Sequence, residues 1–196
     1  MDYILVLAAN YLIGSVPFAY IVGRLYRGID IRKHGSGNVG ATNAFRILGT
    51  WPGLLVFAAD MGKGIAGVCL ARGVGGSWFV VLAALVVMAG HNYSVFLGFK
   101  GGRGVATGAG IILSLTPVVI LLAVGIFVII LITTRYVSLA SIIAAGSVPV
   151  LMVFFNAPLP VNILGLTAAA FVIYRHRPNI RRLLDGTEPK VTDKAK

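Results

Sequence analysis

The chain of 196 residues is 58% hydrophobic, contains only 12% charged residues and has a mean hydropathy of +0.91. Soluble domains contain about a quarter charged residues, so this composition excludes an ordinary soluble protein. The apolar runs are continuous rather than alternating, which favours membrane-spanning helices over a β-barrel. We therefore expect the net charge of +11 to interact with the anionic headgroups of a lipid bilayer and with anionic substrates. We expect no nucleic acid partner.

Apolar segments separated by polar loops give the order of the expected membrane helices. The stretch 105–134 decides their number, because Thr116-Pro117 divides it. As one kinked helix it gives six crossings and places the basic tail outside; as two segments it gives seven, although 105–115 is shorter than the roughly 20 residues of a usual span. The expected segments are 3–23, 52–71, 77–97, 105–115, 117–134, 137–155 and 160–175.

Basic residues predict how these segments are oriented. Arg and Lys concentrate in the loops at 24–46 and 100–103 and in the tail at 175–196. The positive-inside rule places such regions in the cytoplasm, and only seven crossings put all three there. We expect an all-α, polytopic integral membrane protein of about seven transmembrane helices, with the N-terminus out and the C-terminus in.

No linker, low-complexity tract or internal repeat divides the chain. We expect a single membrane-embedded domain over residues 1–196, with a short basic cytoplasmic tail from about residue 176. The single cysteine, Cys69, lies in an apolar run, where we expect it to be buried.

The first polar loop is rich in glycine and in short polar side chains. Glycine lets backbone N–H groups approach an oxyanion without hindrance from a Cβ atom, and Arg46 can bind two phosphate oxygens at once. An ordinary turn is the alternative, because the same residue types dominate turns. The phosphate-binding candidates here are Gly35, Ser36, Gly37, Asn38, Gly40, Thr42, Asn43 and Arg46.

The second polar loop, 98–104, is also glycine-rich and basic, and it leads into the expected helix 105–115. A glycine-rich turn before a helix N-terminus is a favourable place for an anion. The loop does not match the nucleotide-binding P-loop pattern, and a basic topological anchor is the alternative. The candidates here are Lys100, Gly101, Gly102, Arg103 and Gly104.

Several polar residues lie within or next to apolar segments. Asp60 and Lys63 share a helix face, and structural tethering is favoured over catalysis for this pair. His91 serves either structure or function. The cationic neighbours of His176 disfavour protonation of its ring, so we expect the ring to be neutral. Ser141 is a candidate site residue, and the alternative is a hydrogen bond from its hydroxyl to the backbone of its own helix. No residue cluster has metal-ligand spacing, so we expect no metal and no cofactor.

Three stretches in this order resemble the bacterial acyl-phosphate:glycerol-3-phosphate acyltransferase family, PlsY. They are Gly35 to Asn43 with Arg46, Gly90-His91 followed by Gly98 to Thr107, and Arg175-His176-Arg177 with Asn179; the stretch from Tyr136 to Ser141 is also similar.

The resemblance implies an enzyme of phospholipid biosynthesis in the bacterial cytoplasmic membrane, with its site facing the cytoplasm. It would transfer a fatty acyl group from acyl phosphate to the sn-1 hydroxyl of glycerol 3-phosphate, releasing lysophosphatidic acid and phosphate. The resemblance predicts Lys in many members where this chain has Arg103. The residues to which it assigns catalytic roles are Ser36, Arg46, Arg103, Ser141, His176 and Asn179.

Two other classes of function remain open on the residues alone. A transporter of an organic phosphate fits the number of helices, although transporters bind substrate near the bilayer midplane and often contain repeats. A nonenzymatic subunit that binds anionic lipid explains the charge but not the spacing of the glycines. For the enzyme, the general base is either His176 or a phosphate oxygen of a substrate.

Overall fold

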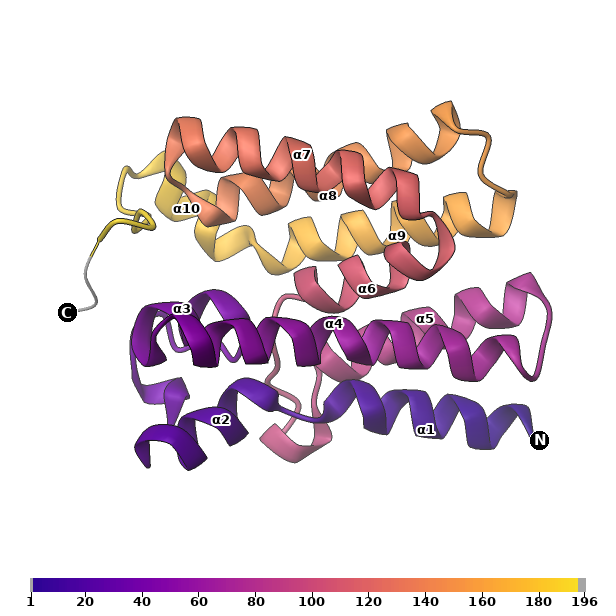
Figure 1. Ribbon diagram of the computed structural model, residues 1–196, viewed down its shortest axis with the longest axis horizontal. Helices are drawn as coiled ribbons and strands as arrows, with labels where there is room; N and C mark the ends of the chain where they lie inside the picture. Colours follow the sequence, from indigo (N-terminus) through magenta and orange to yellow (C-terminus); the bar gives the residue numbers. More distant parts are fainter. Residues whose placement is uncertain (1, 194–196) are drawn as a thin grey trace. The chain divides into compact units, whose positions relative to one another are not determined.

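We describe residues 2–193 of a computed structural model, and these residues form helices and connecting loops without a β-strand (Figure 1). Five helical segments in this range are long and apolar enough to cross a membrane, and α9 with α10 makes a sixth if that bent pair is one span. The predicted all-α architecture is confirmed for these residues. The total of about seven crossings stays a prediction.

The chain divides into two compact units. The first ends at Ile111 and the second covers Ile112–Asp193, so the boundary falls within α6. The first unit contains α1 (Tyr3–Ser15), α2 (Phe18–Arg27), the 3-10 helix η1 (Ile31–Lys33), α3 (Ala41–Leu48), α4 (Thr50–Arg72), α5 (Ser77–Asn92), the 3-10 helix η2 (Val95–Leu97) and most of α6 (Val105–Leu115). The second contains α7 (Pro117–Thr134), α8 (Val137–Phe154), α9 (Leu159–Arg175) and α10 (Arg177–Leu184).

The first expected segment, 3–23, lies within the candidate span Tyr3–Arg27, and this span is divided into two helices after Ser15. Pro17 lacks a backbone N–H and its ring clashes with the preceding turn, which separates α1 from α2. The break leaves the Ser15 carbonyl without its helical partner, and the hydroxyl of Ser94 donates a hydrogen bond to it. By contrast, the predicted division at Thr116 is confirmed, with Pro117 as the first residue of α7.

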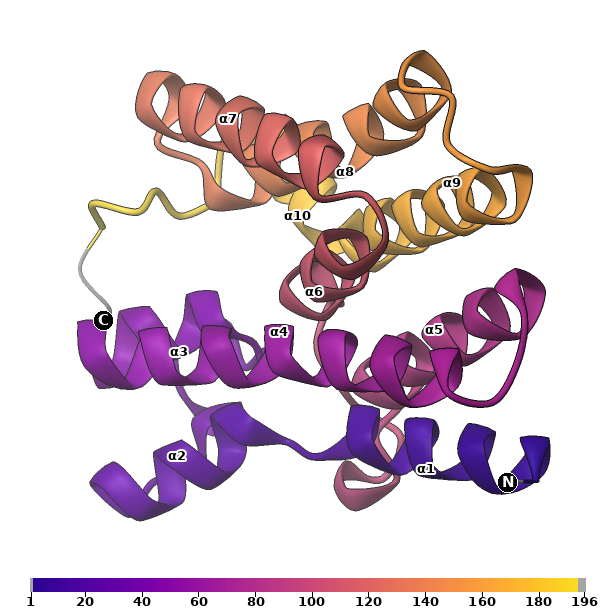
Figure 2. The same cartoon turned by 45° about the vertical axis from the view of Figure 1, so that its right-hand side comes forward.

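Helices of the first unit approach closely because glycines lie at their contacts. A methyl group on Gly14 of α1 would overlap the Val87 backbone of α5, and one on Gly64 of α4 would overlap the Thr107 carbonyl of α6. Small residues at helix contacts are the usual way for membrane helices to pack. Figures 1 and 2 show α1, α4 and α5 running alongside one another, with α6 beside α4.

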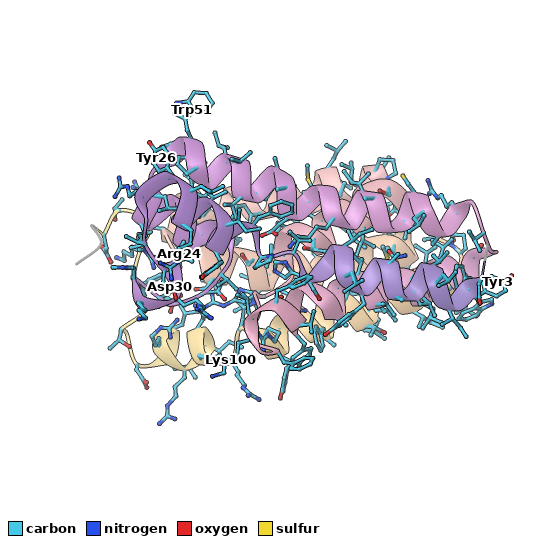
Figure 3. The ribbon with its side chains drawn as sticks, turned by 90° about the horizontal axis from the view of Figure 1, so that it is seen from below. Tyr3, Arg24, Tyr26, Asp30, Trp51 and Lys100 are labelled. Atoms are coloured by element: carbon cyan, nitrogen blue, oxygen red, sulfur yellow. The ribbon has the colours of Figure 1, made fainter. Side chains whose placement is uncertain are left out.

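Apolar packing fixes the polar end of the first unit. Side chains from α2, η1, the first glycine loop, α3, α4 and η2 form one buried cluster, including Ile31, Val39, Leu48, Val56 and Leu97. Figure 3 shows Arg24 and Asp30 together at this end and Tyr3 at the opposite end of the unit. Cys69 is exposed on α4, so the prediction of a buried cysteine is wrong.

In the second unit, α8 packs between α7 and α9, and α10 contacts both α8 and α9. The segment after α10 folds back to the junction of α7 and α8. There the backbone N–H of Val191 donates to the carbonyl of Arg135 at 2.9 Å, and the Lys190 ammonium lies 5.6 Å from the centre of the Tyr136 ring. Part of the predicted polar tail is therefore ordered against the unit.

Candidate active site

The first glycine loop is a folded structure held by the side chain of Asn43. The Oδ1 atom of Asn43 accepts from the Ser36 N–H at 3.0 Å, and its Nδ2 atom donates to the carbonyls of Ile31 and His34 at 3.3 and 3.1 Å. Asn43 is only 1% exposed. This predicted phosphate ligand therefore shapes the loop from inside, while Ser36 is exposed.

Glycine is required at two turns of this loop, because Gly35 and Gly37 have φ angles of +59° and +69°. The loop ends at the N-terminus of α3, where Gly40 gives no side-chain cap. Within residues 2–193, the backbone N–H groups of Ala41 and Thr42 have no hydrogen-bond acceptor. Such unpaired N–H groups at a helix start attract anions.

Two cations adjoining the loops make no polar contact with the part of the chain that the structure describes. Arg46 lies in the last turn of α3 and is half-buried, and Lys100 is exposed in the second loop. Neither forms a hydrogen bond or ion pair within residues 2–193. By contrast, Arg24 and Arg32 both lie beside Asp30, at 3.9 and 2.7 Å. The bidentate hydrogen bonds from Arg32 hold the pKa of Asp30 well below its usual value.

The second glycine loop packs against the end of α5. The N–H of Gly102 donates to the carbonyl of His91 at 3.1 Å, and a methyl group on Gly102 would overlap the His91 ring. A small cavity is lined by Val39 from the first loop and Gly101 from the second, so the two loops are neighbours. The other residues lining it are Ser15, Val16, Pro17, Lys63, His91, Ser94 and Leu97.

In the second unit, His176 lies at the junction of α9 and α10 and is 2% exposed. Its Nδ1 atom is 2.8 Å from the carbonyl oxygen of Val172. Because a carbonyl only accepts, Nδ1 carries the proton, and the lone pair of the neutral ring is then on Nε2. Ser141, on α8, donates its hydroxyl hydrogen to the Val137 carbonyl at 2.8 Å. This is the hydrogen bond to the helix backbone that the sequence offered as the alternative role of Ser141.

Glu188 contacts the predicted site residue Asn179, and the sequence reasoning missed it. Its carboxylate accepts from Asn179 Nδ2 at 2.6 Å and from Arg182 Nε at 2.7 Å, and only 8% of the residue is exposed. Burial alone would raise the pKa of Glu188, but the polar groups of Ser138, Asn179 and Arg182 around its carboxylate outweigh burial and lower the pKa. The sequence offered little signal, because Glu188 is one of three acidic residues in this tail, together with Asp185 and Asp193.

The lowered pKa of Glu188 predicts a stability that depends on pH. A carboxylate whose pKa is lower in the folded state stabilises the fold above its unfolded pKa, near 4.5, and this stabilisation is lost as the pH falls through the folded value. Glu188→Gln should lower the free energy of unfolding at neutral pH by about 1–3 kcal/mol and flatten its decrease in acid. Thermal unfolding in detergent between neutral and acidic pH measures both effects.

Asp185→Asn is the matched control for this experiment, because Asp185 is exposed and lies in the same segment. The control should keep the acid dependence of the wild type. A Glu188→Gln variant with an unchanged melting temperature at every pH would show that the buried contacts of Glu188 do not stabilise the fold.

The described fold and these loops define a class of protein. Several long apolar helices support glycine-rich turns that carry cations at a polar end, which is typical of a polytopic helical membrane protein that handles anionic substrates.

The comparisons with known proteins agree with this class. A family model described as glycerol-3-phosphate acyltransferase matches residues 4–186. Glycerol-3-phosphate acyltransferase 2 of Moorella thermoacetica is 51% identical over 193 residues, which are 98% of this chain and 100% of that protein. The chain therefore belongs to the glycerol-3-phosphate acyltransferase family.

Two solved structures share the fold. Both are crystal structures of PlsY, an integral membrane glycerol 3-phosphate acyltransferase, one in a glycerol 3-phosphate form and one in a lysophosphatidic acid form. The first is 40% identical with a TM-score of 0.92, and the second is 39% identical with a TM-score of 0.90. Each comparison covers 96% of this chain and 94% of the other. The present chain is thus an all-α, polytopic integral membrane protein.

Proposed function

We propose that this protein transfers a fatty acyl group from acyl phosphate to the sn-1 hydroxyl of glycerol 3-phosphate, releasing lysophosphatidic acid and phosphate. The observation that carries the proposal is the pair of neighbouring glycine loops, whose cations Arg46 and Lys100 are without a polar partner in residues 2–193. An anionic substrate would supply that partner. Membership of the glycerol-3-phosphate acyltransferase family supports the choice of reaction.

The reaction requires mainly that the protein position its two substrates. Acyl phosphate is a mixed anhydride that already carries a good leaving group, so the protein needs to hold two anions together and stabilise the oxyanion that develops at the carbonyl. We assign the neutralisation of charge to Arg46, Lys100 and Arg103, assisted by N–H groups of the two loops. The N–H groups of Ala41 and Thr42 are the clearest donors in the first loop.

The acceptor needs a different set of contacts. We assign the orientation of glycerol 3-phosphate to Ser36, Ser141, His176 and Asn179. Attack by the hydroxyl oxygen on the carbonyl carbon forms the ester bond and breaks the bond to phosphate, and the hydroxyl proton leaves. The proton goes either to Nε2 of His176, which holds the lone pair of the neutral ring, or to a phosphate oxygen of a substrate.

We further propose a bacterial cytoplasmic membrane location, with about seven crossings, the N-terminus out and the C-terminus in. We propose a single membrane-embedded domain over residues 1–196, with the binding residues facing the cytoplasm. The basic loops and tail, under the positive-inside rule, support the orientation.

The donor is tested with purified protein, labelled glycerol 3-phosphate and either acyl phosphate or acyl-CoA. We expect product with acyl phosphate, no product when donor or acceptor is omitted, and a rate with acyl-CoA at least about a hundredfold lower, because a thioester gives the phosphate-binding loops no leaving phosphate. Efficient use of acyl-CoA would overturn the proposed donor. Counterflow of glycerol 3-phosphate in vesicles without acyl transfer would instead favour a transporter.

A further inference from the structure

One end of the first unit presents large apolar side chains next to basic ones. Leu25 and Tyr26, in the last turn of α2, are 83% and 62% exposed. Trp51, in the first turn of α4, is 82% exposed. Figure 3 shows Tyr26 and Trp51 at this end of the unit and Tyr3 at the opposite end. These side chains are not part of the protein core, so another molecule is needed to cover them.

The length of α4 places this end at one boundary of the bilayer. The helix contains 23 residues, which span about 34 Å at a rise of about 1.5 Å per residue. The hydrocarbon core of a bilayer is about 30 Å thick, so the two ends of α4 lie at its two boundaries. Trp78, in the first turn of α5, is 59% exposed at the other boundary. Tryptophan and tyrosine are the side chains that concentrate at headgroup level.

The end with Trp51 also has an excess of positive charge. Asp30 is the only acidic residue between positions 3 and 59, and Arg24 and Arg32 both lie beside it, at 3.9 and 2.7 Å. Arg27 is exposed and forms no ion pair within residues 2–193. The charge of Arg27 is therefore left for a negatively charged group from outside the described chain.

Arg27 is held next to the exposed aromatic side chains. Its Nη1 atom donates to the carbonyl of Ile47 at 2.9 Å, which ties the end of α2 to the end of α3, just before Trp51. The guanidinium has further N–H groups that this hydrogen bond does not use. A cation in the last turn of a helix also stabilises that helix. That role uses only the charge and does not explain the exposed rings beside it.

We propose that Arg27, Tyr26 and Trp51 bind the headgroup of an anionic phospholipid in the leaflet that borders this end of the unit. The Arg27 guanidinium binds the phosphodiester oxygens, the two rings lie at headgroup level, and Leu25 lies among the acyl chains. A zwitterionic lipid would bring its own cation to a surface that is already positive, so a lipid of net negative charge binds better. The site uses none of the residues assigned to the reaction.

Quenching of tryptophan fluorescence by brominated lipids measures this preference directly. The chain has two tryptophans, so Trp78→Phe leaves Trp51 as the single reporter. The full-length protein is reconstituted in bilayers that mix phosphatidylglycerol and phosphatidylcholine, with one lipid or the other brominated. We expect phosphatidylglycerol to bind beside Trp51 about three to five times more strongly than phosphatidylcholine, and Arg27→Gln to bring this ratio near one.

Trp51→Phe is the matched control, because it leaves Trp78 as the reporter at the opposite end of the unit, where the ratio should stay near one. Arg27→Lys keeps the charge and should retain most of the preference. Salt tests the site without any change at Arg27. Raising NaCl from about 0.05 M to about 0.5 M should lower the ratio at Trp51, since salt screens exposed charges.

Equal ratios at the two tryptophans, a ratio at Trp51 that salt does not change, or an unchanged ratio in folded Arg27→Gln would each overturn the inference. Loss of the preference when inorganic phosphate replaces chloride at constant ionic strength would show that a free anion occupies the site, and would overturn the lipid as its occupant. The measurement involves no acyl transfer, so its outcome is independent of the proposed function.

Discussion

Replacing Arg46 by alanine is expected to lower kcat/KM at least about a hundredfold, corresponding to roughly 3 kcal/mol of transition-state stabilisation. Arg46 is half-buried on α3, and its guanidinium makes no hydrogen bond or ion pair within residues 2–193. The residue therefore contributes no ion pair whose loss would unfold the described protein. Steady-state kinetics with both substrates varied would measure the loss, and the melting temperature should stay near that of the wild type.

Arg46→Lys tests the geometry of this contact, because lysine keeps the charge but not the two-pronged donor. We expect it to recover part of the activity and to remain about tenfold below the wild type. Arg72→Ala, at the opposite end of α4, is the control for loss of a cation and should retain full activity. Wild-type kinetics for Arg46→Ala would remove Arg46 from the proposed site.

His176→Ala is expected to lower kcat by roughly 10² to 10⁴-fold, the range that a positioned acid–base or hydrogen-bonding group supplies. The ring is buried and its Nδ1 atom is engaged with the Val172 carbonyl, so chemistry is left to Nε2. Single-turnover rates with saturating substrates would separate this loss from weaker binding.

The substitution His176→Asn distinguishes the roles of the two ring nitrogens of His176. The asparagine amide can replace the Nδ1 donor to Val172 but offers nothing at the place of Nε2, so His176→Asn should fold normally and be as inactive as His176→Ala. Glutamine places an amide near Nε2 and can hydrogen-bond but cannot act as a base at neutral pH. Activity in His176→Gln would therefore favour a substrate phosphate as the base, and activity in His176→Asn would contradict any role for Nε2.

Local rules made most of the helix pattern predictable. Continuous apolar runs gave the long helices, and Pro117 marked a true boundary. Pro17 also marks a helix boundary, between α1 and α2. Because the run 3–23 is apolar on both sides of Pro17, the sequence contained no second sign of a break there. The exposure of Cys69 could not be read from its apolar neighbours, since a membrane helix is apolar on its outer face as well as its inner face.

The candidate site was predictable as a set of stretches but not as a set of contacts. Asn43 was expected as a ligand because its side chain is polar, yet three hydrogen bonds within the loop occupy it. Asp60 and Lys63 were expected to pair from their spacing, and they do, but the addition of His91 depends on how α4 meets α5. Glu188 was missed because its hydrogen-bond partners, Asn179 and Arg182 on α10, meet its carboxylate only when the segment after α10 folds back.

Sidedness of labelling tests the central claim most directly, namely that the basic loops and the C-terminal segment face the same substrates. Cys69→Ala removes the single cysteine, and new ones are introduced one at a time as Lys33→Cys, Phe99→Cys and Lys190→Cys, with Gly76→Cys in the opposite α4–α5 turn as the reference. An impermeant maleimide should modify the first three only from the cytoplasmic side and the reference only from outside. Modification of position 190 from outside, with position 33 reached only from the cytoplasm, would contradict the account.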